Sequence, residues 1–262
     1  MCRLLGYLGK PIQLEHLIYK PDHSLIVQSY QPKEMTSGLL NADGFGVGWY
    51  HAHHQVEPYT YKNTLPIWND INLPSLSRYV ESGCILASVR SATPGLPVDL
   101  SNCQPFQSGS ILGIHNGFVS NFRQTLYRPL RNRLSDKTYK TIIGNTDSEH
   151  IFALFLNELE KLPNSSLTTA LHNTIDTLCE LAHNQSVDFS ANIIISNGNQ
   201  LVASRFANRD PVPTLYWLQT SSFFSEALLV ASEPIFEGDW QPLPSHSILT
   251  VSHDLKPQIQ PI

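Results

Sequence analysis

The sequence lacks the features that direct a protein to a membrane or to an export pathway. Its first residues, MCRLLGYLGK, hold one arginine and a short apolar stretch broken by Gly6 and Gly9, so the apolar core of a signal peptide is missing. No run in the chain approaches the roughly 18 apolar residues that a membrane span needs. We therefore expect a cytoplasmic protein that has no membrane partner.

Positive charge is also scarce. The 262 residues include 17 Lys and Arg against 22 Asp and Glu, which gives a formal net charge of -5. Nucleic-acid binding depends on a basic surface that faces the phosphates, and this composition offers none. We expect a small-molecule substrate and no nucleic acid, and nothing in the charge pattern specifies an oligomeric state.

Cysteine is too sparse for a disulfide framework or a zinc site. The four cysteines lie far apart and form no CxxC pair; they are Cys2, Cys84, Cys103 and Cys179. The stretch HAHH at 51–54 has no acidic or histidine partner at a recognised metal-ligand spacing, so we interpret it as a solvated loop. The sequence thus predicts reduced thiols, no metal and no cofactor.

The apolar pattern that is present predicts one domain of mixed α and β structure over residues 2–262, without repeats or a linker. Strands are predicted at CRLLGYLG, GFGVGWY, CILASV, GSILGI, ANIIIS, QLVASRF, TLYWLQ, ALLVAS and SILTVS. Asn197-Gly198 is a turn signal between two of these strands.

Two helices interrupt the strands. TDSEHIFALFLNELEKL and SLTTALHNTIDTLCELAHN carry apolar residues at helical spacing, and Thr146 with Glu149 has the spacing of a capping box. Strands, then helices, then strands do not fit a parallel βαβ sheet. We therefore expect an α+β fold of antiparallel sheets covered by helices on their outer faces.

Cys2 directly follows the initiator methionine. If that methionine is removed, Cys2 carries both a free thiol and a free α-amine, which can act together as nucleophile and base. On its position alone, Cys2 is equally consistent with a buried strand cysteine, because unpaired cysteine is among the most buried residue types.

Three further polar positions stand out against apolar surroundings, and each has a structural alternative. Arg90 follows a buried strand and fits either an internal salt bridge or a fork that binds a substrate carboxylate. Asn116-Gly117 fits either a tight turn or a pair of donors for an oxyanion. Asp147 fits either a helix-capping carboxylate or a group that binds a ligand ammonium.

Taken together, these stretches resemble the class II glutamine amidotransferases, which are N-terminal-nucleophile hydrolases that begin with cysteine. MCRLLGYLG, VRSAT, HNG and NTDSE occur in the order of that family, and NADGFGVGWY and LLVASEP also look like its elements. The resemblance implies a four-layer αββα sandwich of two antiparallel sheets flanked by helices.

The same resemblance implies a role for each matched residue. Cys2 would be the nucleophile and its own α-amine the base, while Asn116 and Gly117 would hold the oxyanion. On the substrate side, Arg90 would bind the α-carboxylate of a γ-glutamyl group, Asp147 its α-ammonium, and Thr93 would line the pocket.

The chain also departs from the large amidotransferases of this class. Ser91 and Pro94 replace two positions of their R-W-A-T-H motif, and no acceptor domain is expected because the fold uses up the chain. The closer resemblance is to the stand-alone γ-glutamyl-hercynylcysteine S-oxide hydrolases of ergothioneine biosynthesis. The alternatives are a stand-alone glutaminase, a glutathione-degrading enzyme of this type, or a subunit that donates ammonia to a separate synthase.

Overall fold

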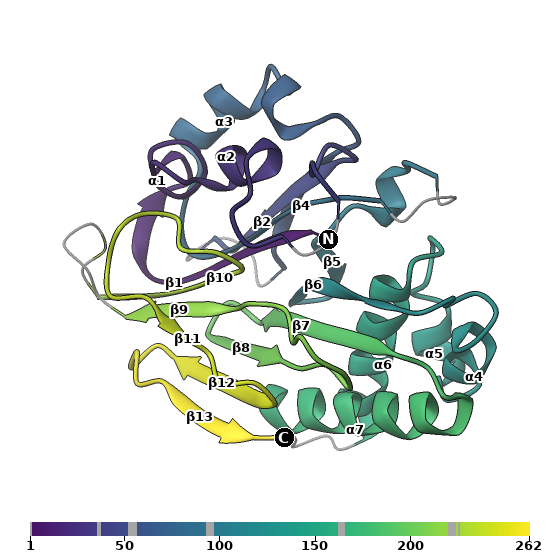
Figure 1. Ribbon diagram of the computed structural model, residues 1–262. Helices are drawn as coiled ribbons and strands as arrows, with labels where there is room; N and C mark the ends of the chain where they lie inside the picture. The colour runs from purple at the N-terminus through teal and green to yellow at the C-terminus, as the bar shows by residue number, and fades with distance from the viewer. Residues whose placement is uncertain are drawn as a thin grey trace.

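Two antiparallel sheets pack face to face, and helices cover both outer faces (Figure 1). The computed structural model describes residues 2–35, 38–51, 57–92, 97–161, 166–219, 224 and 226–262. No helix in these ranges is long and apolar enough to cross a membrane, and no group of three potential metal ligands lies together there.

The first sheet has seven strands with β1 near its centre. Their order across the sheet is β11 (Gln241–Pro242), β9 (Tyr216–Gln219), β10 (Ala227–Ala231), β1 (Arg3–Gln13), β4 (Glu81–Val89), β2 (Phe45–Trp49) and β3 (Tyr59–Asn63). β1 is apolar on both faces because both are covered: Leu4 and Leu8 face the second sheet, and Leu5 and Tyr7 face helices.

The second sheet has six strands and carries the HNG stretch. Their order is β13 (Gln258–Pro261), β12 (Ser247–Ser252), β8 (Gln200–Arg205), β7 (Phe189–Ser196), β6 (Ile111–Val119) and β5 (Phe106–Ser108). β6 packs against β1 and β4 of the first sheet, so residues on its inner face lie between the sheets.

Three clusters of buried apolar residues fill the spaces between four layers. One lies between the first sheet and the short helices α1 (Glu15–Ile18), α2 (Leu25–Tyr30) and α3 (Leu73–Tyr79) with the 3-10 turn Ile67–Asn69. A second lies between the sheets. The third lies between the second sheet and α4 (Tyr127–Arg131), α6 (Asp147–Lys161) and α7 (Leu167–Gln185), with α5 (Asp136–Tyr139) beside α6. The expected αββα sandwich is confirmed.

The expected strands and helices are confirmed in position, and Asn197-Gly198 forms the predicted turn between β7 and β8, with Gly198 at φ +89°. One local alternative is wrong. Asn116-Gly117 is not a tight turn, because both residues lie inside β6 and pair with β7 along its length. The sheet partner overrides the local turn preference here.

The predicted capping box forms only in part. The Thr146 hydroxyl accepts the Glu149 N–H at 3.2 Å, as the pattern predicts. The Glu149 carboxylate, however, accepts the N–H groups of Ile143 and Gly144 at 2.8 and 3.0 Å instead of that of Thr146. Burial raises the pKa of Glu149, and these two N–H groups partly oppose that shift.

Candidate active site

Cys2 stands directly before β1, at one end of the first sheet. β1 and β4 pair with Arg3 opposite Val89, so the next step of the register places Cys2 opposite Arg90. On the other side, the Leu4 N–H donates to the Ser232 hydroxyl, and the Leu4 carbonyl accepts the Ser232 N–H, both at 3.0 Å. Because side chains alternate along a strand, Cys2 shares the inner face with Leu4. Cys2 forms no disulfide, and the residue is half-buried.

The residue after Cys2 is anchored by a buried carboxylate. Arg3 donates to Glu233 at 2.8 Å, and both side chains are 1% exposed. Glu233 also accepts from His23 and from the N–H groups of Lys33 and Glu34, at 2.8, 2.8 and 3.0 Å. Burial alone would raise the pKa of Glu233, but these bonds and the Arg3 charge outweigh it and lower the pKa to about 2. The start of β1 is therefore fixed firmly.

Arg90 is a buried cation with little internal compensation. Its side chain is 5% exposed, and its Nη1 donates to the Asp43 carbonyl at 3.3 Å. No ion pair to Arg90 is found among the described residues. The backbone around it is held tightly, because Asp43 and Gly44 bond to Arg90 and the Asp43 carboxylate accepts the Ala92 N–H at 2.7 Å. The internal salt bridge that the sequence left open is thus not formed within the described chain.

Asn116 is fully buried on the inner face of β6, beyond Leu112 and Ile114. Neither its Nδ2 nor its Oδ1 has a hydrogen-bond partner in the described part of the structure. Its neighbour Gly117 must be glycine, because a Cβ there would lie 1.9 Å from the Ser190 carbonyl oxygen. An unpartnered buried amide is costly in a resting protein, so it is a candidate group for a ligand.

Asp147 begins α6, and its carboxylate accepts the N–H groups of Val119 and Ser148, both at 2.8 Å. It therefore joins the start of α6 to the end of β6, three residues beyond Asn116. His115 lies next to it on the outer face of β6 and bonds to Ser148 at 2.8 Å. Burial lowers the pKa of His115, and the Asp147 charge partly opposes that shift.

Gln104 connects the two sheets at this end of the molecule. Its side chain donates to the His115 carbonyl at 2.9 Å and accepts the His115 N–H at 2.5 Å. Its own carbonyl accepts from Ser88 at 3.4 Å, two residues before Arg90. The structure thus brings Cys2, Arg90 and Asn116 to one end of the sandwich, with Asp147 at the adjoining helix start. Thr93 lies outside the described residues, as do His53 and His54.

The other three cysteines are held as neutral thiols by burial. Burial raises the pKa of Cys84 to about 12 and that of Cys179 to about 11. Burial also raises the pKa of Cys103, although the charges of Arg90 and Lys62 oppose it. A thiolate is the reactive form, so these residues are poor nucleophiles.

Four residues of this region were not among the predicted site residues: Arg3, Glu233, Asp43 and Gln104. A signal was available for the first two, because a charged residue within an otherwise apolar run needs a buried partner. The partners are 230 residues apart, however, and no local pattern connects them. Gln104 carries no comparable signal.

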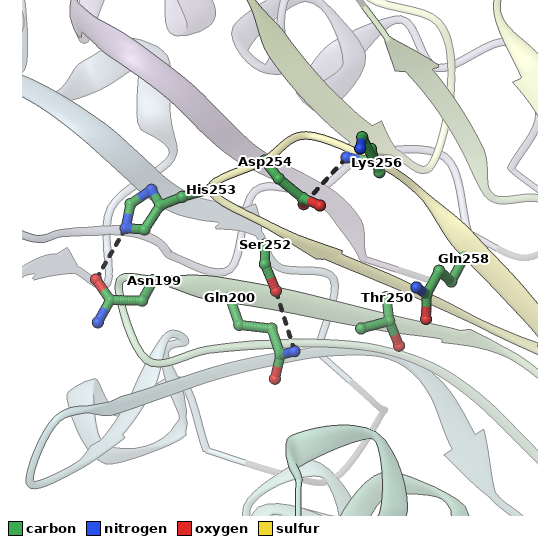
Figure 2. A pocket seen from close by; sticks show the side chains of 8 residues that line it. All are labelled: Asn199, Gln200, Thr250, Ser252, His253, Asp254, Lys256 and Gln258. Carbon is green, nitrogen blue, oxygen red and sulfur yellow. Dashed lines mark hydrogen bonds between the residues drawn. The ribbon is translucent and has the colours of Figure 1, made fainter.

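An open hollow of about 520 Å³ lies elsewhere (Figure 2). Side chains of β8, β12 and β13 and the adjoining turns line it, and Figure 2 shows the His253–Asn199 and Gln200–Ser252 hydrogen bonds at its edge. Two of its lining residues, Asn199 and Gln200, follow the Ser196 end of β7. Asn192, which pairs with Asn116, lies nearer the other end of that strand. The hollow therefore does not coincide with the candidate catalytic residues.

A four-layer αββα sandwich with cysteine at the start of a central strand defines an N-terminal-nucleophile hydrolase fold. Residues 1–233 match the family model of glutamine amidotransferases class-II. The chain therefore belongs to the class II glutamine amidotransferases, a family of enzymes.

Relatives in sequence support the same family. The chain is 34% identical to the probable glutamine amidotransferase DUG3 of Saccharomyces cerevisiae, over 96% of this chain and 82% of the relative. It is 32% identical to the gamma-glutamyl-hercynylcysteine sulfoxide hydrolase of Mycolicibacterium smegmatis, over 96% of both chains. A Mycobacterium tuberculosis protein of the same name is 42% identical, but over only 45% of this chain and 50% of the relative.

Solved structures agree with the fold. A glutamine aminotransferase class-II domain protein from Silicibacter pomeroyi superposes with a TM-score of 0.73 at 27% identity, over 100% of this chain and 99% of that one. The glutamine phosphoribosylpyrophosphate amidotransferase of Bacillus subtilis gives a TM-score of 0.66 at 16% identity, over 99% of this chain and 49% of that one. The second likeness concerns the fold alone.

Proposed function

We propose that this enzyme hydrolyses a γ-glutamyl C–N bond through a thioester on Cys2 and releases glutamate, with γ-glutamyl-hercynylcysteine S-oxide as substrate. The observation that carries the proposal is Asn116, a fully buried amide without a partner in the described chain, at the end of the sandwich where Cys2 begins its strand. The Mycolicibacterium relative, which matches over the whole length, supports the choice of substrate.

The proposed reaction begins with removal of Met1, which frees the α-amine of Cys2. This amine takes the thiol proton as the sulfur attacks the γ-carbonyl carbon. The oxyanion that forms accepts hydrogen bonds from the Asn116 side chain and the Gly117 N–H. The α-ammonium then gives its proton to the departing amine, and a water molecule attacks the thioester to release glutamate and restore the thiol.

Substrate binding follows from the charges around Cys2. The Arg90 guanidinium has one hydrogen bond to the described chain, which leaves N–H groups for a bidentate contact with the α-carboxylate of the glutamyl group. The Asp147 carboxylate would accept a hydrogen bond from the α-ammonium while keeping the one that it accepts from the Val119 N–H. These two contacts read only the glutamyl part, so the departing amine must be selected elsewhere in the site.

The experiment compares three substrates with the trimmed enzyme, whose mass is first measured to verify the loss of Met1. Glutamate release is followed with γ-glutamyl-hercynylcysteine S-oxide, glutathione and glutamine. We expect the highest kcat/KM with the S-oxide, by at least about tenfold. Cys179→Ala is the matched control for Cys2→Ala, and it should retain the activity. Glutamate release by Cys2→Ala, or none by the trimmed wild type, would refute the mechanism.

Glutamine is the second candidate substrate. The observation that favours it is the yeast relative, which is 34% identical over 96% of this chain and is named a probable glutamine amidotransferase. A clear preference for glutamine over the S-oxide in the same assay would select this alternative. Glutamine hydrolysis that rises when a synthase copurifies would indicate an ammonia-donating subunit.

A further inference from the structure

A second buried asparagine lies directly across from Asn116. Asn192 of β7 is the register partner of Asn116 in the antiparallel pair β6–β7. Both side chains are 0% exposed. Asn192 shares the inner face of β7 with Ile194, which packs between the sheets, as Asn116 shares that of β6 with Ile114. The two side chains therefore lie on the same face of neighbouring strands, at the end of the sandwich that holds Cys2.

The orientation of the Asn192 amide is fixed by the backbone. Its Nδ2 donates to the carbonyl oxygens of Pro213 and Thr214, at 3.1 and 3.0 Å. An amide nitrogen has two N–H donors, and both are used here. Its Oδ1 must then point away from that loop, and this atom is buried without a partner in the described structure. Asn192 therefore offers one fixed, free acceptor.

Asn116 can supply the donor that this acceptor needs. Side chains directly opposite each other in an antiparallel pair have Cβ atoms about 4.5–5.5 Å apart, so rotation of the Asn116 side chain can bring its Nδ2 to the Asn192 Oδ1. The opposite orientation would place two carbonyl oxygens against each other. An acceptor on Asn192 thus selects the orientation in which Asn116 presents nitrogen.

We propose that Asn192 is a positioning residue for the oxyanion site: when the Asn116 side chain turns toward β7, the Asn192 Oδ1 accepts one of its N–H groups and leaves the second N–H for the oxyanion. This inference rests on the proposed function, because it assigns a purpose to Asn192 only if Asn116 holds the oxyanion. Asn192 itself touches neither the substrate nor the reacting atoms.

The other end of Asn192 is connected to the strand of the nucleophile. Thr214, whose carbonyl accepts from Asn192, donates its hydroxyl to the Ser232 carbonyl at 3.0 Å. Ser232 in turn exchanges two hydrogen bonds with Leu4, two residues after Cys2. A continuous set of hydrogen bonds thus runs from Asn192 to β1. It sets the position of the oxyanion donor relative to the sulfur across two different sheets.

The test measures kcat and KM for Asn192→Ala with the substrate that the wild type hydrolyses best. We expect kcat to fall about 10- to 100-fold, since a small misplacement of a catalytic group can cost that much, and KM to stay within about threefold. The matched control is Asn157→Ala. Asn157 is also a buried asparagine, and it donates to the Arg133 carbonyl at 3.2 Å, but it lies on α6 away from the site. This control should lose stability and keep its kcat.

A double-mutant cycle distinguishes positioning from general destabilisation. If Asn192 acts through Asn116, the variant carrying both Asn116→Ala and Asn192→Ala should be no slower than Asn116→Ala alone. Alkylation of Cys2 by iodoacetamide should proceed at the wild-type rate in Asn192→Ala, because the nucleophile is untouched. The inference would be overturned if the loss of kcat in the double variant equalled the product of the two single losses, or if kcat were unchanged in Asn192→Ala.

Two further measurements keep the test decisive. If Asn192→Ala does not fold, Asn192→Leu replaces it, because leucine fills a similar volume and offers no acceptor, and the same loss of kcat is expected. A wild type that hydrolyses no γ-glutamyl substrate would refute the proposed function itself. An active wild type with an unaffected Asn192→Leu would refute only the role of Asn192.

Discussion

At the end of the sandwich that carries Cys2, the start of β1 and the facing strands β6 and β7 differ in how their buried polar groups are paired. On the first sheet, Arg3 and Glu233 bond to each other and Ser232 bonds to Leu4 through both backbone and side chain. On the facing strands of the second sheet, both polar atoms of Asn116, the Oδ1 of Asn192 and the Oγ of Ser190 have no partner in the described chain.

This difference separates polar groups that hold the fold from polar groups that the resting fold leaves unpaired around the proposed oxyanion site. A buried ion pair such as Arg3–Glu233 is costly to break but does not by itself add much net stability, so its main effect here is to fix the strand that begins after Cys2. An unpartnered amide costs free energy in the resting state, and a substrate oxygen can recover it. Four substitutions test this division.

The largest effect is expected for Cys2→Ala. Without the sulfur no thioester can form, so kcat should fall by at least about 10⁴-fold, as losing a covalent nucleophile typically does. Binding should persist, because Arg90 and Asp147 are unchanged. The measurement is glutamate release together with the dissociation constant of glutamate by calorimetry. Lost binding with full folding would show that the thiol shapes the pocket instead of performing the chemistry.

Asn116→Ala should have the next largest effect. Removing one oxyanion donor lowers kcat by about 10²- to 10³-fold, and KM should change little because the donor acts mainly in the transition state. The stability loss should be smaller than that of Asn157→Ala, which removes bonds to the Ser135 N–H and the Arg133 carbonyl. Steady-state kinetics and urea unfolding of both variants test this. A kcat that stays within threefold of wild type would contradict the role of Asn116.

Much of the fold was predictable from local patterns. The apolar strand runs and the two long helices lie where the sequence placed them, because their burial follows directly from apolar spacing. The helices α1–α3 were not predicted, since each has only four to seven residues and too few turns for a periodic signal. The catalytic roles of Cys2, Arg90, Thr93, Asn116, Gly117 and Asp147 stay predictions.

What local patterns could not supply is the pairing across the chain. Asn116-Gly117 has a strong turn preference, yet Asn192 and Ala191 pair with it and keep it in a strand. Arg3 finds Glu233 only because β1 and β10 become neighbours in the first sheet. Register and sheet order are tertiary properties, so the sequence indicated the candidate polar residues without their structural partners.

The third effect is expected for Glu233→Gln, and it concerns the free energy of unfolding instead of kcat. The pKa of Glu233 is lowered from about 4.5 to about 2, so this residue stabilises the folded state above pH 4.5 and loses this contribution as the pH falls toward 2. The pH-dependent difference in stability between the ionised and the protonated carboxyl amounts to roughly 3 kcal/mol, whatever the net contribution of the ion pair. Urea unfolding between pH 7 and pH 2 should show this decline in the wild type and a clearly flatter one in Glu233→Gln.

The control for that titration is Asp188→Asn. Asp188 pairs with Arg209 at 3.0 Å, but the two side chains are 47% and 55% exposed. Exposed pairs contribute between zero and about 1 kcal/mol, so this variant should follow the wild-type curve. If Glu233→Gln also followed the wild-type curve, the stability of the first sheet would not depend on its buried carboxylate. The Arg3–Glu233 pair could then not be counted among the groups that hold the fold.

The smallest effect is expected for Arg90→Lys. Lysine keeps the charge but cannot form the planar fork that binds a carboxylate through two N–H groups. KM for the γ-glutamyl substrate should rise about tenfold, with kcat little changed, because the lost contact is present in both the ground state and the transition state. The readout is the ratio of kcat/KM for glutamine to that for 4-aminobutanamide, which lacks the α-carboxylate, and this ratio should shrink.

Arg133→Lys is the matched control, because Arg133 carries the same side chain but is 43% exposed and pairs with Glu180 on the surface. Its discrimination between the two amides should equal that of the wild type. If the Arg90→Lys enzyme kept the wild-type ratio of kcat/KM for glutamine to that for 4-aminobutanamide, another cation would have to bind the α-carboxylate. Arg90 would then belong with the groups that hold the fold, through its bond to the Asp43 carbonyl, and Asn116 would remain as the polar group kept for the substrate.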